Sequence, residues 1–345
     1  MSIVSNKFRL AVIGAGGVGS IHIRNALSSD EIQLVGICEL DEARALSCLG
    51  NHEVPVEKKI ESLMQYEPNG IVVSSPTSTH GSICKQIIEF NLPFLCEKPI
   101  ATDYSEAKQI HQYASNKEVY GAMAFNRRFH ERYQQMREAV RKGQIGTPET
   151  IHVVSRTARP PSAKFITTSG GLFGEKGSHF YDLIRWIFNT DVTEVFTFGD
   201  ALFAPEFKEI SEPDTAAICL RLNNGIICTL DFSWHSAYGQ DERLEIFGSE
   251  GMIQGIQDTD RAFQHFGKDG YSRGGQFPGW QSMFHQTYIE ELHTFVSEVR
   301  HGNSRIMPTL MDGVEAQRVA QAIQRSYSEK RRVAISEIEY SPLSV

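Results

Sequence analysis

The sequence predicts an α/β protein: an N-terminal doubly wound parallel sheet, followed by an α+β domain with an open, mostly antiparallel sheet. Three observations lead to this fold class. Short apolar runs alternate with helical patterns in the first third of the chain. A glycine-rich turn directly follows the first apolar run. After about residue 123, strand-like runs mostly follow one another, and some are joined by short turns.

Residues 1–123 are expected to form a dinucleotide-binding domain. Apolar runs predict buried strands at residues 8–13, 33–38, 70–73, 93–96 and 119–124. Helical patterns fall between them at residues 20–27, 41–49, 82–90 and 105–115. Parallel sheets of this kind bind ligands outside the carboxyl ends of their strands, so the chemistry is expected there.

Residues 124–345 are expected to form a substrate-binding and oligomerisation domain. Strand-like runs occupy residues 149–156, 194–198, 215–222, 225–234 and 243–247. Helices are expected at residues 130–142, 177–188, 288–299 and 312–328. The last of these helices could pack back on the first domain.

Composition excludes several classes of protein. The 345 residues carry a formal charge of −8, which argues against a general nucleic-acid or membrane-surface binder. None of the six cysteines forms a CxxC or zinc-like pair, so reduced core thiols and a cytoplasmic location are expected. The N-terminus lacks a leader pattern, and no apolar run approaches the roughly 18 residues of a membrane span.

The glycine-rich turn fits the pattern G-x-G-x-x-G. Because it follows a strand and opens a helix, it has the context of a dinucleotide-binding loop. The helix N-terminus would offer free N–H groups to a pyrophosphate. The expected cofactor contacts are Gly14, Gly16, Gly17, Val18 and Gly19.

Glu39 ends the second strand, about 20 residues after the loop, where a carboxylate binds the adenosine ribose. It is followed by Leu40 and not by a basic residue. A 2′-phosphate would be repelled there, so NAD is favoured over NADP. Asp41 is the alternative ribose partner, although its position is more typical of a helix N-cap.

Two further strand ends carry candidate residues. The third ends in Ser75, Pro76 and Thr77, with His80 following, which could line the cofactor or form a plain capped loop. The fourth ends in Glu97-Lys98-Pro99. Lys98 could donate to a substrate hydroxyl or take part in a proton relay. Glu97 could line the cofactor ribose or pair locally, and a cis bond before Pro99 would set the turn.

In the second domain, Glu175, His179 and Asp182 are spaced to share one helical face. A histidine held by a carboxylate is suited to accept a hydroxyl proton near neutral pH. The alternatives are a zinc site built on Glu-x-x-x-His, for which no third ligand is evident, and a satisfied helix-terminal histidine. No metal is expected.

These residues resemble the glucose–fructose oxidoreductase, inositol dehydrogenase and MocA family, and the likeness covers nearly the whole chain. The closer likeness is to the inositol 2-dehydrogenase branch. The family motifs are Gly14-x-Gly16-x-x-Gly19-x-x-His22, Pro76-Thr77-x-x-His80, Glu97-Lys98-Pro99, Asn126-Arg127-Arg128-Phe129, Gly143-x-Ile145-Gly146, Gly170-Gly171 with His179-x-x-Asp182, and Phe247-Gly248-Ser249-x-Gly251. The branch motifs are Ser155-Arg156, Arg159-Pro160-Pro161 and Ala237-Tyr238-Gly239-x-Asp241-x-Arg243.

The resemblance implies hydride transfer between a carbinol of a sugar or polyol and the nicotinamide of NAD(P), in a homodimer or homotetramer. It implies that His179 is the base and that Lys98 hydrogen-bonds the reacting oxygen, with Glu175 beside them. Asn126 is expected to contact both cofactor and substrate. The other expected substrate contacts are Arg127, Arg156, Asp182 and Tyr238.

Three positions depart from the family pattern. Glu175 stands where the family usually has aspartate, Phe180 follows the histidine, and Thr157 follows Ser155-Arg156. Fewer acidic acceptors should weaken recognition of a fully hydroxylated ring, so the expected substrate is inositol-like or an aldose, with a different cyclitol or a deoxy or anhydro sugar as alternatives to myo-inositol itself. The alternative functions are a keto-sugar reductase running in the opposite direction and a non-catalytic NAD(H)-binding sensor.

Overall fold

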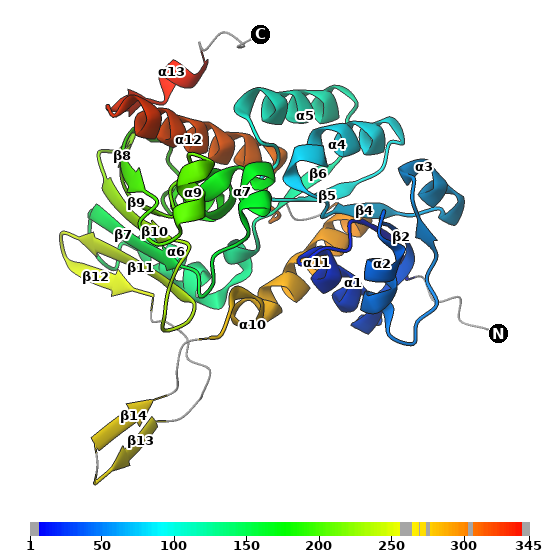
Figure 1. Cartoon of the computed structure of the whole chain (residues 1–345), viewed down its shortest axis with the longest axis horizontal. Coiled ribbons are helices and arrows are strands. Elements are labelled where there is room, and N and C mark those ends of the chain that lie inside the picture. The colour runs from blue at the N-terminus through cyan, green and yellow to red at the C-terminus, as the bar shows by residue number, and fades with distance from the viewer. Residues whose placement is uncertain (1–6, 256–263, 269, 274–276, 303–305, 340–345) are drawn as a thin grey trace. The chain divides into compact units, whose positions relative to one another are not determined.

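The computed structural model describes residues 7–255, 264–268, 270–273, 277–302 and 306–339. The N-terminal residues on which the expectation of no leader rests lie outside these ranges. The chain divides into two compact units (Figure 1). The first unit contains Met1–Asn126 and Gln286–Gln317, and the second contains Arg127–His285 and Arg318–Val345. The boundary between Asn126 and Arg127 lies close to the expected division at residue 123, but residues 286–317, which were expected in the second domain, belong to the first unit.

The first unit is built on a six-stranded parallel sheet. Its strand order is β3-β2-β1-β4-β5-β6, an order typical of dinucleotide-binding folds. The strands are β1 (Phe8–Ile13), β2 (Ile32–Cys38), β3 (Val56–Glu57), β4 (Gly70–Val73), β5 (Phe94–Glu97) and β6 (Gly121–Ala124). The five strands expected from apolar runs are confirmed. The two-residue β3 was not expected, because it is too short to show a pattern.

Helices of the first unit connect these strands. They are α1 (Gly19–Ser28), α2 (Glu42–Leu49), α3 (Ile60–Leu63), α4 (His80–Glu89) and α5 (Tyr104–Asn116), with short 3₁₀ turns η1 (Met64–Tyr66) and η2 (Thr77–Thr79). Helix α11 (His285–His301) brings a distant part of the chain to this unit. Its Phe295 ring lies 6.4 Å from Phe8 and 6.2 Å from Tyr120, so α11 is part of the apolar core.

The second unit is built on a seven-stranded sheet of order β12-β11-β7-β10-β9-β8-β15. Its strands are β7 (Pro148–Arg156), β8 (Val192–Asp200), β9 (Thr215–Leu222), β10 (Ile227–Ser233), β11 (Asp241–Gly248), β12 (Gly251–Gln254) and β15 (Val333–Ala334). Strands β7 and β10 are parallel, and the other pairs are antiparallel. The mostly antiparallel sheet expected from the sequence is thus confirmed.

Helices cover one face of this sheet. The Phe180 ring of α8 (Ser178–Phe188) lies 5.4 Å from that of Phe232 in β10. The remaining elements are η3 (Asn126–Phe129), α6 (Glu131–Arg141), α7 (Ala163–Ser169), the π-helical turn η4 (Leu172–Lys176), α9 (Pro205–Glu209), the hairpin β13 (Gln264–Gly267) and β14 (Gly270–Arg273), α10 (Trp280–Met283), α12 (Leu310–Glu329) and α13 (Ser336–Glu339). No helix among the described residues is both long and apolar enough to span a bilayer.

Candidate functional site

The glycine loop joins β1 to α1, and its glycines serve two different purposes. Gly14 has a φ of +92°, and a Cβ placed there would lie 2.6 Å from the Ser74 carbonyl oxygen. A Cβ on Gly19 would lie 2.1 Å from the Gly14 carbonyl oxygen. By contrast, a Cβ on Gly16 or Gly17 would meet nothing within 4 Å. The fold therefore requires Gly14 and Gly19, while Gly16 and Gly17 leave the backbone open to a ligand.

Glu39 lies at the carboxyl end of β2, and its side chain is tied to the glycine loop. One carboxylate oxygen accepts from the Ala15 backbone N–H at 2.8 Å, and the other accepts from the Asp41 backbone N–H at 3.0 Å. Asp41 accepts from the Arg44 backbone N–H and caps α2, as predicted. The Arg44 guanidinium lies 3.5 Å from Glu39, so a basic side chain does stand beside this carboxylate.

The candidate residues after β4 gather around a buried histidine. His80 is 1% exposed. Its Nε2 lies 3.0 Å from the Ser75 carbonyl oxygen, and its Nδ1 lies 2.8 Å from that of Pro99. Thr77 is also buried, and the Ser75 hydroxyl shares a hydrogen bond with that of Thr79. Pro76 is the residue before η2. The contacts of these residues with a cofactor stay predictions.

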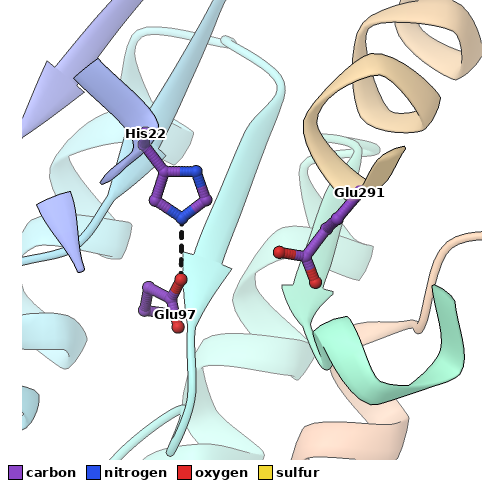
Figure 2. A group of neighbouring side chains, drawn as sticks. All are labelled: His22, Glu97 and Glu291. Carbon is purple, nitrogen blue, oxygen red and sulfur yellow. Dashed lines mark hydrogen bonds and ion pairs between the residues drawn. The ribbon is translucent and has the colours of Figure 1, made fainter. Parts of the chain in front are cut away.

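Lys98 follows the last residue of β5, and the peptide bond between Lys98 and Pro99 is cis, as expected. Glu97 is 5% exposed and accepts from the His22 ring through Oε1 at 2.7 Å (Figure 2). Its other oxygen accepts from the Lys98 backbone N–H at 3.3 Å. Local pairing, one of the two roles predicted for Glu97, is therefore present in the structure.

A carboxylate from α11 lies near this pair. The ligand atoms of His22, Glu97 and Glu291 all lie within 4.8 Å of one another, and all three residues are buried (Figure 2). Among the described residues, these three side chains form a group that could hold a metal ion. Asn126 is fully buried and donates to the Thr287 hydroxyl at 3.0 Å, so α11 also holds this candidate residue.

In the second unit, two arginines of η3 are paired with buried carboxylates. Arg128 donates to both oxygens of Asp182, at 2.9 and 2.5 Å, and Asp182 is fully buried. Arg127 donates to Glu242 and lies 3.8 Å over the Phe284 ring. Asp182 and Arg127 were predicted to contact substrate, and the structure gives both of them protein partners. Their substrate contacts stay predictions.

His179 and Glu175 come from two kinds of helix. His179 lies in the first turn of α8 and is 7% exposed. Glu175 belongs to the π-helical turn η4, with Gly177 between the two elements. The helix expected at residues 177–188 therefore begins at Ser178, and an α-helical spacing relates His179 to Asp182 but not to Glu175.

Arg156 and Tyr238 lie together, on the face of the sheet opposite to η4. Arg156 donates to the Tyr238 hydroxyl at 3.1 Å and pairs with Asp231. The preceding residue, Ser155, is buried on the other face and accepts from Lys176 of η4. Because successive strand residues point to opposite faces, Arg156 points away from η4 within this unit.

Comparison with known proteins shows which family the chain belongs to. Residues 8–125 match the family model described as "Oxidoreductase family, NAD-binding Rossmann fold", and residues 137–335 match "Oxidoreductase family, C-terminal alpha/beta domain". The chain belongs to the GFO/IDH/MocA oxidoreductase family. It is therefore an NAD(P)-dependent oxidoreductase with an NAD-binding Rossmann domain. The open glycine cradle and Glu39 fit such a cofactor.

Among GFO/IDH/MocA relatives, the myo-inositol 2-dehydrogenase of Thermotoga maritima is 30% identical over 96% of this chain and 99% of its own. The scyllo-inositol 2-dehydrogenase (NAD(+)) of Bacillus subtilis is 28% identical over 88% of this chain and 90% of its own. A crystal structure of a probable dehydrogenase from Thermotoga maritima is 29% identical with a TM-score of 0.90, covering 96% of this chain and all of that one.

Four residues near the GFO/IDH/MocA motifs were not predicted as site residues: His22, Lys176, Glu242 and Glu291. Lys176 is 7% exposed, donates to the hydroxyls of Ser155 and Thr157, and lies 4.5 Å over the Trp234 ring. A signal for Glu291 was available, because it occupies the buried face of a helix with Tyr288 and Phe295. The partners of Lys176 and Glu242 come from distant segments of the chain, so neighbouring residues do not predict these contacts.

Proposed function

We propose that this protein is an NAD-dependent dehydrogenase that oxidises a secondary hydroxyl of a cyclic polyol or sugar. One observation carries the proposal. Lys98 follows the carboxyl end of β5, on the same edge of the parallel sheet as the glycine loop and Glu39. A lysine at the strand end of an NAD-binding Rossmann domain is suited to hydrogen-bond a reacting oxygen.

The proposed roles follow from side-chain chemistry. Bound NAD supplies the hydride acceptor. His179 accepts the proton of the substrate hydroxyl, because a neutral imidazole is a suitable base near neutral pH. Lys98 donates a hydrogen bond to the oxygen as the carbonyl forms, and Glu175 is kept as the third proposed catalytic residue. Asn126, Arg127, Arg156, Asp182 and Tyr238 are kept as proposed substrate contacts.

The substrate class is supported by the named relatives, which are inositol dehydrogenases. Two of the three positions that differ from the family pattern contact other residues of the protein. Phe180 is 1% exposed and packs on Phe232, and Thr157 accepts from Lys176. Neither position offers a carboxylate to a substrate, which supports keeping a different cyclitol, an aldose or a deoxy sugar beside myo-inositol in the proposed substrate class.

NAD is proposed as the working cofactor in preference to NADP. Glu39 is bound to the loop proposed to hold the pyrophosphate, which supports a role for its charge in repelling a 2′-phosphate. Arg44 reduces this repulsion, but it is half exposed and already pairs with Glu39 and Asp41. NAD is therefore expected to be preferred, with NADP used at lower efficiency.

The open face of the second unit's sheet is proposed to join copies of this chain into a dimer or tetramer. Apolar side chains stand exposed on it, with Phe198 at 69%, Ile227 at 43%, Phe247 at 44% and Met252 at 53%. An apolar face of this kind is typical of subunit interfaces. Light scattering of the purified protein measures the number of copies.

A cytoplasmic location is proposed from the cysteines. All six are free thiols, and five of them are buried. Unpaired cysteines are typical of a reducing compartment. Fractionation of cells that express the protein tests this location.

The activity is tested with purified protein, NAD and a panel containing myo-inositol, scyllo-inositol, aldoses and deoxy sugars. Reduction of NAD followed by absorbance supports the proposal. Oxidation of NADH by the matching ketones and no reverse reaction would favour a reductase instead. Tight NADH binding in a calorimeter, with no turnover in either direction, would favour a sensor.

A further inference from the structure

Lys98 is flanked by two residues, Glu97 and Pro99, and a buried histidine contacts each of them. We propose that His22 and His80 are positioning residues, which hold the Glu97-Lys98-Pro99 segment so that the Lys98 side chain meets the substrate oxygen. The proposal rests on the proposed function of Lys98. The two histidines come from different helices, α1 and α4, each of which follows a strand of the parallel sheet.

His22 acts on the side chain that precedes Lys98. It is fully buried in the first turn of α1, and its Nε2 lies 2.7 Å from Glu97 Oε1 (Figure 2). The second oxygen of Glu97 accepts from the backbone N–H of Lys98. The imidazole therefore sets the orientation of a carboxylate that is itself bonded to the backbone of Lys98.

His80 acts on the backbone that follows Lys98. Its Nδ1 lies 2.8 Å from the Pro99 carbonyl oxygen, and its Nε2 lies 3.0 Å from that of Ser75. It thus joins the strand-end loops after β4 and β5. Both acceptors are carbonyl oxygens, so a neutral ring can donate to only one of them, whereas a charged ring can donate to both.

Fixing both neighbours matters because a lysine side chain is long and flexible. Such a side chain has many rotamers, and a misplacement of about 1 Å can cost roughly a hundredfold in rate. A rigid backbone at Lys98 removes one source of that misplacement. Loss of either histidine bond should therefore lower kcat more than it changes the binding of NAD.

A metal ion is the competing account of the His22, Glu97 and Glu291 group. The geometry favours a hydrogen bond. Two ligands of one tetrahedral metal, each at about 2.1 Å from it, lie about 3.4 Å apart. The 2.7 Å between His22 and Glu97 is the length of a charge-assisted hydrogen bond.

Paired variants separate the bonds of each histidine. The Gln side-chain amide can replace the Nε2 donor, and the Asn amide can replace the Nδ1 donor. His22→Gln keeps a donor for Glu97, whereas His22→Met, of similar length, does not. His80→Asn keeps the donor for Pro99, whereas His80→Gln keeps the one for Ser75. We expect kcat to fall ten- to hundredfold in His22→Met and His80→Gln. It should fall less in His22→Gln and His80→Asn, which keep the donors for Glu97 and Pro99.

Hydrogen–deuterium exchange of the same variants gives a readout that needs no substrate. Peptides covering residues 97–102 should exchange faster in His22→Met and His80→Gln than in their paired variants. Exchange rates that do not differ within each pair would overturn the proposal, as would equal kcat values. A stoichiometric metal ion, detected by elemental analysis and lost in His22→Gln, would also overturn it.

The two proposals fail separately. Wild-type protein that oxidises no member of the panel contradicts the proposed dehydrogenase. The exchange comparison within each pair then still decides whether the histidines hold the segment. If the wild type is active but the two variants of each histidine have equal kcat values and equal exchange rates, only the positioning role is contradicted.

Discussion

Arg127 donates to both carboxylate oxygens of Glu242 inside the second unit, at 3.4 and 3.2 Å. The Tyr133 hydroxyl donates to the same carboxylate at 2.8 Å. Burial alone would raise the pKa of Glu242, but the charge of Arg127 and these hydrogen bonds hold it below its ordinary value. Replacing one member of a buried pair leaves the other charge uncompensated.

Glu242→Gln is therefore expected to destabilise the second unit by about 3–5 kcal/mol. Thermal and urea denaturation measure the change. Glu245→Gln is the matched control, because Glu245 lies on the same strand but is only half-buried. A Glu242→Gln protein as stable as the control would contradict the importance of the pair.

The same carboxylate predicts a dependence of stability on pH. Since the folded pKa of Glu242 lies below its unfolded value, its contribution is complete above the unfolded pKa of 4.5 and is lost as pH falls through the folded pKa. Stability of the wild type measured from pH 7 down to about 3 should fall more steeply than that of Glu242→Gln. Parallel curves for the two proteins would refute this assignment.

The glycine loop allows the demands of folding and binding to be separated. Gly19→Ala would place a Cβ 2.1 Å from the Gly14 carbonyl oxygen, so we expect a loss of stability visible as a lower Tm. Gly17→Ala meets no atom within 4 Å and should fold normally, yet bind NADH more weakly because its methyl enters the ligand side of the loop. Calorimetric titration with NADH and thermal melts distinguish the two effects. A normal Tm for Gly19→Ala, or unchanged NADH affinity in Gly17→Ala, would argue against this division.

Glu39 is predicted to set the preference for NAD. Glu39→Gln removes its charge, so we expect weaker NAD binding and a ratio of NAD to NADP efficiency that falls about tenfold, equivalent to ~1.4 kcal/mol. Arg44, released from its ion pair, would then be available to a 2′-phosphate. Glu42→Gln is the control, since Glu42 is an exposed carboxylate in the first turn of α2 with no proposed cofactor contact. The assignment is wrong if Glu39→Gln keeps the wild-type ratio.

Much of the first unit could be predicted from the sequence because its signals are local. β4 was predicted with the observed bounds, since an apolar run ends at polar residues. The glycine loop, Glu39 and Lys98 follow from their places at strand ends. The N-cap at Asp41 was also predictable, because the capping side chain and its partner lie three residues apart.

What could not be predicted depends on contacts between distant residues. Asp182 was expected to face substrate, yet Arg128, 54 positions away, binds both of its oxygens. Glu97 is held by His22 across 75 positions. Arg156 was grouped with His179 by family resemblance alone, and only the strand register shows that it shares a sheet face with Asp241. The return of α11 to the first unit likewise has no local signal.

The most direct test of the central claim is kcat for Lys98→Met, measured on a polyol that the wild type oxidises with NAD. Lys117→Met, a surface lysine that pairs with Glu89, is the matched control. If Lys98 hydrogen-bonds the reacting oxygen, Lys98→Met should lose about 10²–10⁴-fold in kcat while binding NADH as the wild type does. Full turnover by Lys98→Met would contradict the account.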